Sequence, residues 1–580
     1  MDKLKPYIQA LPDMFSYQIV TKILLAVWIF LLGRIFQALL KSTGRIAVTS
    51  GDFMFLFNTW QGILILIIGL VSLFIYVTFD INAKIVISSN IVTGAEVKLK
   101  DNIKRAVSSI GKLMNIRGTL VVLYIAFVAP ILGFGLSISL TRNFYIPTFI
   151  TAVIESSSLY SVLADIAVLV FFSVGIANLF IMHGIVIDDL AVRDAGRQSS
   201  AMMKENWKDY LKQNVLFIGV IVAAVLGTVL VFLILPVYII GLIHVPAALN
   251  RIITIFLVSA GVCISLLVDL IAIPVYILKM TQLYYSYREN EPYEIKVKKR
   301  EIGPGIKRCT AVVLAAVFLA VALMYVNFDQ LFPVQTKVSI VAHRAGGNEG
   351  IENSLSGMET AWKAGAYGSE IDVQRTKDGY YVLNHDSTFK RVAGDDRRPE
   401  DVTLREAKRI LVRGEPVATL EEMMISSKGR LVLFIELKGD TADRKMAENV
   451  VKLVKQYRME KECVLISLKY DLIDYIETKY PDIQTGFLTF ASFGKTAELN
   501  CDYLALEEES ATSAAINAVH KERKKVLVWT VNDEESQKHF LCSEADGIIT
   551  DNVSQARKLS GSLENRTDIQ RMVDKVKTIL

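Results

Sequence analysis

The uneven placement of apolar residues constrains this chain more than any other feature. Seven long apolar runs precede Asn327. Their lengths reach or come close to the roughly 20 residues that an α-helix needs to cross a bilayer. They cover residues 19–40, 60–79, 119–140, 160–185, 215–240, 252–278 and 310–326. Together they predict a multi-span α-helical membrane domain over residues 1–330, with about seven transmembrane helices.

Lysine and arginine gather in alternate connections between these runs. The connections after the second, fourth and sixth runs are basic, whereas the first holds only Lys41 and Arg45, and the others are poorer still. Positive residues collect on the cytoplasmic side of membrane proteins, so the amino terminus and the three basic connections are predicted to be cytoplasmic. With seven spans, everything after Val326 is predicted to be extracytoplasmic. If the number of spans differs by one, the residues after Val326 are cytoplasmic instead.

Two acidic residues, Asp165 and Asp269, fall inside predicted spans. Acids within a bilayer are costly and usually face a polar interior or a partner. They indicate either a transport path or lipid passage, or hydrogen bonding inside the helix bundle.

The second half of the chain has the pattern of an α/β barrel. Eight short β-rich runs alternate with helical patterns, which predicts a (β/α)8 TIM barrel over residues 335–560. Residues 561–580 are predicted to form a helical C-terminal tail. The runs cover residues 338–342, 369–373, 431–436, 463–467, 484–488, 503–506, 526–530 and 547–550.

One further strand-like run, Tyr380–Asn384, does not fit the count of eight. The link Arg375–Gly379 before it is too short for a crossover helix, which needs a dozen or more residues. Residues from Gly379 to about Pro399 are therefore predicted to be an insertion after the second strand, and this insertion carries His385.

Acidic residues at the predicted strand ends indicate a metal site. Glu370 and Asp372 are two positions apart on one strand, so their side chains point to the same side, and Glu436 ends the next strand. Three carboxylates form an oxygen-rich set that suits a divalent cation, Mg²⁺ or Ca²⁺. The five cysteines show no metal-type spacing, so nothing favours zinc.

Polar motifs follow one another along the second half of the chain. They are His343-Arg344, Glu352-Asn353, Glu370-x-Asp372, Thr376-Lys377-Asp378-Gly379, His385-Asp386, Glu436-x-Lys438, Trp529-Thr530 and Thr550-Asp551. This order resembles the glycerophosphodiester phosphodiesterase family, in its bacterial type with a membrane domain. Two motifs depart from the usual family pattern: Ala345 stands where a glycine is usual, and Ile351 and Ser354 flank Glu352-Asn353 in place of proline and threonine.

The resemblance implies metal-dependent hydrolysis of glycerophosphodiesters to glycerol 3-phosphate and an alcohol. The chemistry assigns His343 and His385 as general acid and general base, in an order that stays open, and the attacking group is water or a neighbouring hydroxyl of the glycerol. Arg344 and Lys438 are expected to bind phosphate oxygens. By resemblance, Trp529 forms an apolar wall of the substrate pocket. Asp551 is expected to support the site or cap a helix.

Other functions remain open at this stage. Membrane anchoring also fits a lysophospholipid or a glycerol-phosphate polymer as substrate, and the acids in the spans also fit a lipid-handling or transport bundle with an appended barrel. The expected partners are a glycerophosphodiester or lipid-derived substrate and membrane lipid. The net charge of +5 comes largely from the basic connections and gives no reason to expect nucleic acid.

Overall fold

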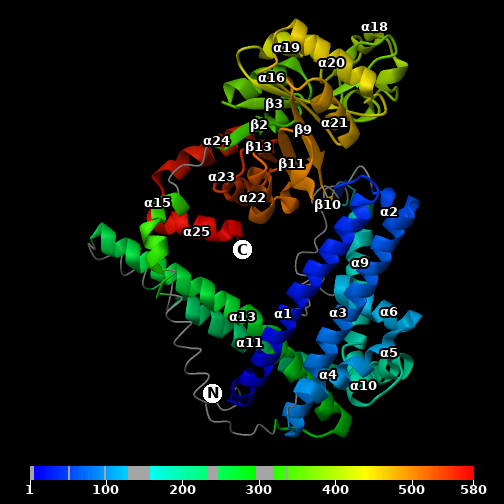
Figure 1. Ribbon diagram of the computed structural model, residues 1–580, viewed down its shortest axis with the longest axis vertical. Coiled ribbons are helices and arrows are strands. Elements are labelled where there is room, and N and C mark those ends of the chain that lie inside the picture. The colour runs from blue at the N-terminus through cyan, green and yellow to red at the C-terminus, as the bar shows by residue number, and fades with distance from the viewer. Residues whose placement is uncertain are drawn as a thin grey trace. The chain divides into compact units, whose positions relative to one another are not determined.

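A computed structural model gives the arrangement of the chain (Figure 1). It describes residues 5–49, 53–96, 99–128, 157–230, 246–295, 321–332, 338–490 and 492–579, and also positions 154, 235, 318 and 319. The chain forms two compact units. The membrane unit comprises residues 1–35 and 63–323, and the barrel unit comprises residues 36–62 and 324–580.

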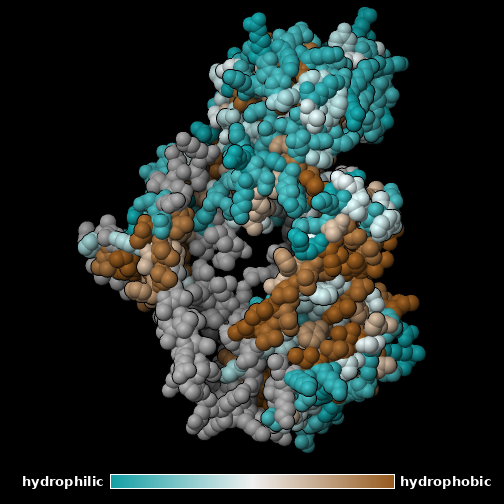
Figure 2. Space-filling model, viewed as in Figure 1, coloured by the Kyte–Doolittle hydropathy of each residue, from teal (hydrophilic) through white to brown (hydrophobic). Residues whose placement is uncertain are grey.

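The membrane unit is helical. Apolar side chains such as Ile23 and Phe30 of α1 and Leu169 of α9 are exposed along its helices, and Figure 2 shows these surfaces in brown. Such surfaces are stable against lipid, because a helix satisfies its own backbone hydrogen bonds. The helices are α1 (Lys5–Lys41), α3 (Trp60–Thr93), α4 (Leu99–Ser108), α5 (Ile110–Leu113), α6 (Ile116–Leu123), η2 (Tyr124–Val128), α9 (Ser158–Ala177), α10 (Ile181–Ile187), α11 (Val192–Val229) and α13 (Ala247–Glu289).

Three helical stretches within the described residues are long and apolar enough to cross a membrane: Ala10–Lys41, Trp60–Thr93 and Ser158–Ile187. A fourth arises if the bent pair Lys100–Leu113 and Ile116–Val128 counts as one span. The first, second and fourth predicted runs are therefore confirmed as apolar helices of spanning length.

Three of the other predicted runs are only partly covered by the structure. The third continues past Val128, the fifth continues past Val229 in α11, and most of the seventh lies outside the described residues. The sixth lies within α13. The total of seven spans stays a prediction.

Eight parallel strands form the barrel unit's closed sheet, and the pairing of β2 with β3 closes it. The predicted TIM barrel is confirmed, and every predicted strand overlaps an observed one. The strands are β2 (Ser339–Ala342), β3 (Gly368–Arg375), β7 (Val432–Leu437), β8 (Cys463–Ser467), β9 (Gln484–Thr489), β11 (Tyr503–Glu507), β12 (Lys525–Trp529) and β13 (Gly547–Thr550).

Helices cover the outside of this barrel (Figure 1). In α20 (Arg444–Gln456), for example, Asp443 caps the first turn by accepting a hydrogen bond from the Met446 amide, and Val450 and Val454 are buried against the sheet. The other helices of two turns or more are α16 (Leu355–Lys363), α19 (Leu420–Ser427), α21 (Tyr470–Lys479), α22 (Ser513–Lys521), α23 (Glu534–Leu541), α24 (Val553–Ser562) and α25 (Asp568–Ile579). The last of these supplies the helix expected in the C-terminal tail.

The predicted insertion after the second barrel strand is present. Tyr380–Asn384 contains β4 (Tyr381–Leu383), which runs antiparallel to β3 with Val373 opposite Leu383. The insertion continues through α17 (Lys390–Ala393), α18 (Leu404–Ala407) and a small hairpin of β5 (Leu411–Val412) and β6 (Glu415–Pro416). His385 lies directly after β4.

A second antiparallel pair joins distant parts of the barrel unit. Strand β1 (Ala47–Thr49), between the first two apolar helices, pairs with β10 (Ser492–Gly494), which follows β9. Gly494 has φ of +106°, and a Cβ there would lie 2.8 Å from the Ile46 carbonyl oxygen, so a glycine is required. Nothing in the sequence pattern predicted this pairing.

Candidate active site

The polar motifs converge at one end of the barrel. His343 follows β2, Glu370 and Asp372 lie in β3, and Glu436 lies near the end of β7. Parallel strands bring their carboxyl ends to the same face, which is where TIM barrels carry their active sites. Polar residues that are far apart in the sequence therefore lie in one cluster at this end of the barrel.

Three carboxylates form the centre of this cluster. Glu370, Asp372 and Glu436 are buried, with exposures of 4%, 1% and 7%. Each offers an oxygen within 4.8 Å of the others'. Asp372 and Glu436 are direct neighbours in the parallel register of β3 and β7, and Glu370 is two positions away on the same face. The predicted acidic triad is thus brought together.

The surroundings of the triad disfavour ionisation of two of its three carboxyl groups. Burial, together with the charges of Asp372 and Glu436, raises the pKa of Glu370 well above its usual range. Burial likewise raises the pKa of Glu436 to about 7. Asp372 differs: burial opposes its ionisation, but Lys438 and His385 outweigh this and lower its pKa.

Lys438 is the cation that partly neutralises the triad. Its Nζ lies 3.0 Å from Asp372 Oδ1 and 3.1 Å from Glu436 Oε2. Although burial disfavours the ammonium, Asp372 and Glu436 raise the pKa of Lys438. One ammonium against three buried carboxylates leaves room for further positive charge. Only oxygen donors lie in the triad, so this set fits a hard divalent cation.

His343 is oriented by a carboxylate. Its Nδ1 is 2.8 Å from Asp551 Oδ1, and Asn532 Nδ2 donates to the other oxygen of Asp551 over 2.6 Å. Burial opposes ionisation of Asp551, but the bond to His343 outweighs it and lowers the pKa of Asp551. Asp551 therefore stays ionised and holds the ring by Nδ1, which leaves Nε2 for proton transfer. The contact places Asp551 beside His343, and the supporting role expected for it stays a prediction.

His385 has a similar arrangement within the insertion. Its Nδ1 is 2.7 Å from Asp386 Oδ1, and Arg391 Nε donates to Asp386 Oδ2 over 2.7 Å. Arg391 also forms two hydrogen bonds of 2.7 Å to the carboxylate of Glu352. Burial lowers the pKa of His385, although the charge of Asp372 opposes this. Both predicted acid–base histidines thus carry a carboxylate on Nδ1.

Comparisons with known proteins decide the family. The membrane domain of glycerophosphoryl diester phosphodiesterase matches residues 3–319, more than half of the chain, and the glycerophosphoryl diester phosphodiesterase family matches residues 343–555. The chain belongs to the glycerophosphoryl diester phosphodiesterases with a membrane domain. It is accordingly a phosphoric diester hydrolase that acts on glycerophosphodiesters, and it is membrane-associated.

Curated relatives match the barrel of this phosphodiesterase. A glycerophosphodiester phosphodiesterase from Caldanaerobacter subterraneus is 28% identical over 235 residues, which are 37% of this chain and 94% of the relative. One from Bacillus altitudinis is 26% identical over 241 residues, 38% of this chain and 97% of the relative. A solved glycerophosphodiester phosphodiesterase from Parabacteroides distasonis, 25% identical, covers 39% of this chain and 98% of its own, with a TM-score of 0.36.

Arg344 follows β2 directly beside His343 and the acidic triad. Its Nη1 is 3.8 Å from Glu352, whereas its buried Nε has no hydrogen-bond partner among the described residues. Its backbone amide donates to Glu370 Oε2 over 2.8 Å. Ala345, the departure from the family's glycine, has φ of +72°, in the left-handed region that glycine adopts most easily. Alanine thus accepts some backbone strain directly beside the site.

Trp529 ends β12 and is partly buried against the apolar interior of the barrel. Its indole N–H donates to the Ala505 carbonyl over 3.0 Å, which fixes the ring. Its predicted contact with substrate stays a prediction. The expected contact of Lys438 with phosphate also stays a prediction, and its ammonium contacts two carboxylates.

Two supporting residues were not singled out from the sequence. Asn353 donates to Asp372 Oδ2 over 2.8 Å and accepts from the Asp372 amide over 3.0 Å, so it orients one carboxylate of the acidic triad. Its place in the Glu352-Asn353 motif was an available signal. Arg391, which bridges Glu352 and Asp386, stands in no motif, and only the fold reveals it.

Proposed function

We propose that this phosphodiesterase requires a divalent cation, Mg²⁺ or Ca²⁺, held by Glu370, Asp372 and Glu436. The buried, mutually repelling carboxylate triad carries this proposal. A bound cation would neutralise the triad and stabilise negative charge that develops on a phosphate oxygen. The products are glycerol 3-phosphate and the alcohol of the diester.

The protein's own groups then supply binding and proton transfer. Arg344 holds a phosphate oxygen through its unpaired Nε. One of His343 and His385 takes the proton of the attacking hydroxyl or water, and the other gives a proton to the departing alkoxide. Asp551 and Asp386 hold the two rings by Nδ1, so that both Nε2 atoms are the reactive nitrogens.

The test uses the full chain in detergent after cations have been stripped with EDTA. Release of glycerol 3-phosphate from glycerophosphocholine is measured with no addition, with Mg²⁺ and with Ca²⁺. We expect release only with a cation, and its loss in His343→Ala and Glu370→Ala. Full activity in EDTA would refute the cation requirement.

We also propose that the barrel lies outside the cytoplasm. Strand β1 belongs to the connection between the first two apolar helices, and β1 pairs with β10 of the barrel unit. The barrel and this connection then share one side of the membrane, whatever the total number of spans. The connection is poor in lysine and arginine, which supports the extracytoplasmic side.

Two labelling measurements test this side. A single cysteine in place of Ser42 should react with a membrane-impermeant maleimide in intact cells, and one in place of Lys204 should react only after lysis. A Val48→Cys/Phe493→Cys pair, opposite each other in the β1–β10 register, should form a disulfide. The reverse labelling pattern would place the barrel in the cytoplasm.

A substrate anchored in the membrane is the second candidate. Strand β10 follows the carboxyl end of β9, the same end of the barrel that carries the active site, and its partner β1 continues directly into Met54, Phe57 and Trp60, all exposed. Aromatic side chains favour the membrane interface. This supports a lysophospholipid or a glycerol-phosphate polymer as substrate.

Rates for glycerophosphocholine and lysophosphatidylcholine in the same mixed micelles distinguish the two candidates. A higher kcat/KM for the lysolipid that falls in Trp60→Ser, with the soluble substrate unaffected, supports the membrane substrate. Equal effects on both substrates would count against it.

A further inference from the structure

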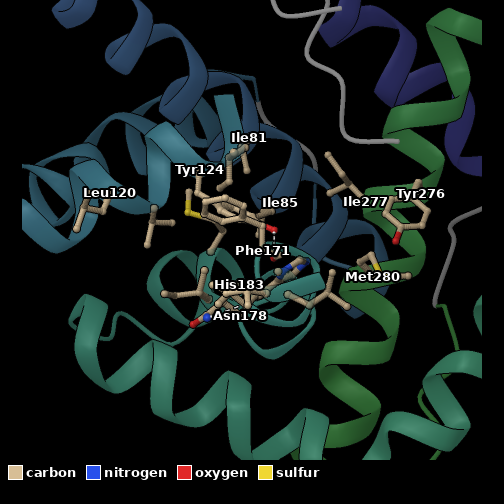
Figure 3. Close-up of a pocket in the computed structure, with 18 residues that line it drawn as sticks. Ile81, Ile85, Leu120, Tyr124, Phe171, Asn178, His183, Tyr276, Ile277 and Met280 are labelled. Carbon is tan, nitrogen blue, oxygen red and sulfur yellow. Dashed lines mark hydrogen bonds between the residues drawn. The ribbon is translucent and has the colours of Figure 1, made fainter. Parts of the chain in front are cut away.

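The membrane unit contains an apolar cavity of about 370 Å³, remote in sequence from every active-site motif. Figure 3 shows its walls, built from α3, α6, η2, α9, α10 and α13. The volume lies within the range of about 300–1,000 Å³ that is usual for small-molecule pockets. Its lining includes Ile81, Ile85, Leu120, Phe171, Ile277 and Met280.

The few polar groups in the wall are largely paired within the protein. The Tyr124 hydroxyl donates to the Phe171 carbonyl over 2.8 Å. The side-chain amide of Asn178 donates through Nδ2 to the Val174 carbonyl over 3.0 Å. Neither group therefore needs a ligand.

His183 is the exception. Its side chain is almost fully buried, with 5% exposure, and its ring stacks on Tyr284 at a centroid distance of 5.4 Å. Its Nε2 is 3.2 Å from Thr281 Oγ1, but its Nδ1 has no hydrogen-bond partner among the described residues. A buried polar atom without a partner is costly, by about 1–3 kcal/mol.

The hydrogen bonds around Thr281 show what His183 lacks. The Thr281 hydroxyl has one hydrogen, and it donates this to the Ile277 carbonyl over 2.8 Å. The Thr281 hydroxyl must therefore accept a hydrogen bond from His183, so the imidazole carries its hydrogen on Nε2. In a neutral imidazole the other nitrogen is then an acceptor. Nδ1 is consequently an acceptor for which the described residues supply no donor.

We propose that this cavity binds one membrane lipid that has an apolar chain and an uncharged hydroxyl at its polar end, as in a monoacylglycerol. The chain fills the apolar space, and the hydroxyl donates to His183 Nδ1. A lone water fits poorly, because a buried water needs two to four polar partners, and His183 Nδ1 is the one buried side-chain atom of the described lining that lacks a partner. Candidate spans form part of the wall, so the bilayer itself supplies the ligand. The proposal is independent of the phosphodiesterase reaction.

Equilibrium binding to the delipidated full chain in detergent tests the proposal, with radiolabelled 1-monooleoylglycerol and methyl oleate as probes. The two share one chain, but only the first has O–H donors. We expect the first to bind at least about fivefold more tightly, in line with the cost of an unpaired acceptor. Equal affinities would overturn the hydrogen bond to His183.

Variants separate the cavity from general adhesion to the helices. His183→Phe keeps the stacked ring but loses the acceptor, so it should abolish the preference for monooleoylglycerol. Val121→Trp places bulk in the cavity wall and should weaken both probes, whereas Leu169→Trp, on an exposed helix face, should weaken neither. Equal behaviour of the two tryptophan variants would refute the cavity as the site. Unchanged hydrolysis of glycerophosphocholine by each variant confirms that it is folded.

Discussion

Asp551 Oδ1 lies 2.8 Å from His343 Nδ1, although 208 positions separate the two residues in the chain. Asn532 donates to the opposite oxygen of Asp551, so the carboxylate accepts a hydrogen bond on both sides. An amide cannot replace it, because one of its two ends carries donors. The pair therefore sets the tautomer of His343 as well as the direction of its ring.

Asp551→Asn should consequently lower kcat by roughly 100-fold with little change in KM, a loss within the usual range for a general acid–base group. The measurement is steady-state hydrolysis of glycerophosphocholine. Asp546→Asn is the matched control, since Asp546 pairs with His520 over 2.9 Å away from the acidic triad. Equal losses in the two variants would mean that the effect is structural.

Glu370→Gln should abolish cation-dependent activity, with a loss of about 10²-fold or more in kcat. Without cation, the same variant should melt at a higher temperature than the wild type, because it removes one of three buried like charges. Adding Mg²⁺ or Ca²⁺ should raise the melting temperature of the wild type but not that of Glu370→Gln. Glu359→Gln, which removes a surface partner of Arg430, is the control and should respond as the wild type does. Cation-dependent stabilisation of Glu370→Gln would exclude Glu370 as a ligand.

Arg391 should act as a positioning residue for His385. Arg391→Ala releases both Asp386 and Glu352, so we expect kcat to fall by about tenfold. Arg391→Lys should recover only part of this loss, because an ammonium cannot form the bidentate pair that the guanidinium makes with Glu352. Arg397→Ala removes an exposed pair with Asp395 in the same insertion and should change little. A pH–rate profile identical to that of the wild type would count against action through His385.

The pair of Arg375 with Asp443 should make stability depend on pH. Two hydrogen bonds of 2.9 and 2.8 Å from Arg375 lower the pKa of Asp443. This contribution is present above the unfolded pKa of about 3.9 and is lost as pH falls through the lower folded value. Because Asp443 is half exposed, we expect only about 0.5 kcal/mol. The free energies of unfolding of the wild type and Asp443→Asn in denaturant should differ at pH 6, and the difference should shrink as the pH falls below about 3.9. A constant difference would refute the linkage.

The fold class and the composition of the site could be predicted from local patterns. Apolar runs of spanning length and short β-rich runs between helical segments are properties of neighbouring residues. Glu370 and Asp372 could be assigned to one face because strand side chains alternate with a period of two. The insertion that carries His385 followed from a link too short for a helix.

Only the tertiary structure decided which distant groups meet. The bond between His343 and Asp551 requires the last barrel strand to lie beside the first, and Lys438 reaches Asp372 because β3 and β7 are neighbours. The pairing of β1 with β10 and the unpaired Nδ1 of His183 likewise depend on segments far apart in the chain. Sequence periodicity records which way a side chain points along its own element, whereas partners across elements are set by barrel closure and helix packing, to which many sequence-distant contacts contribute at once.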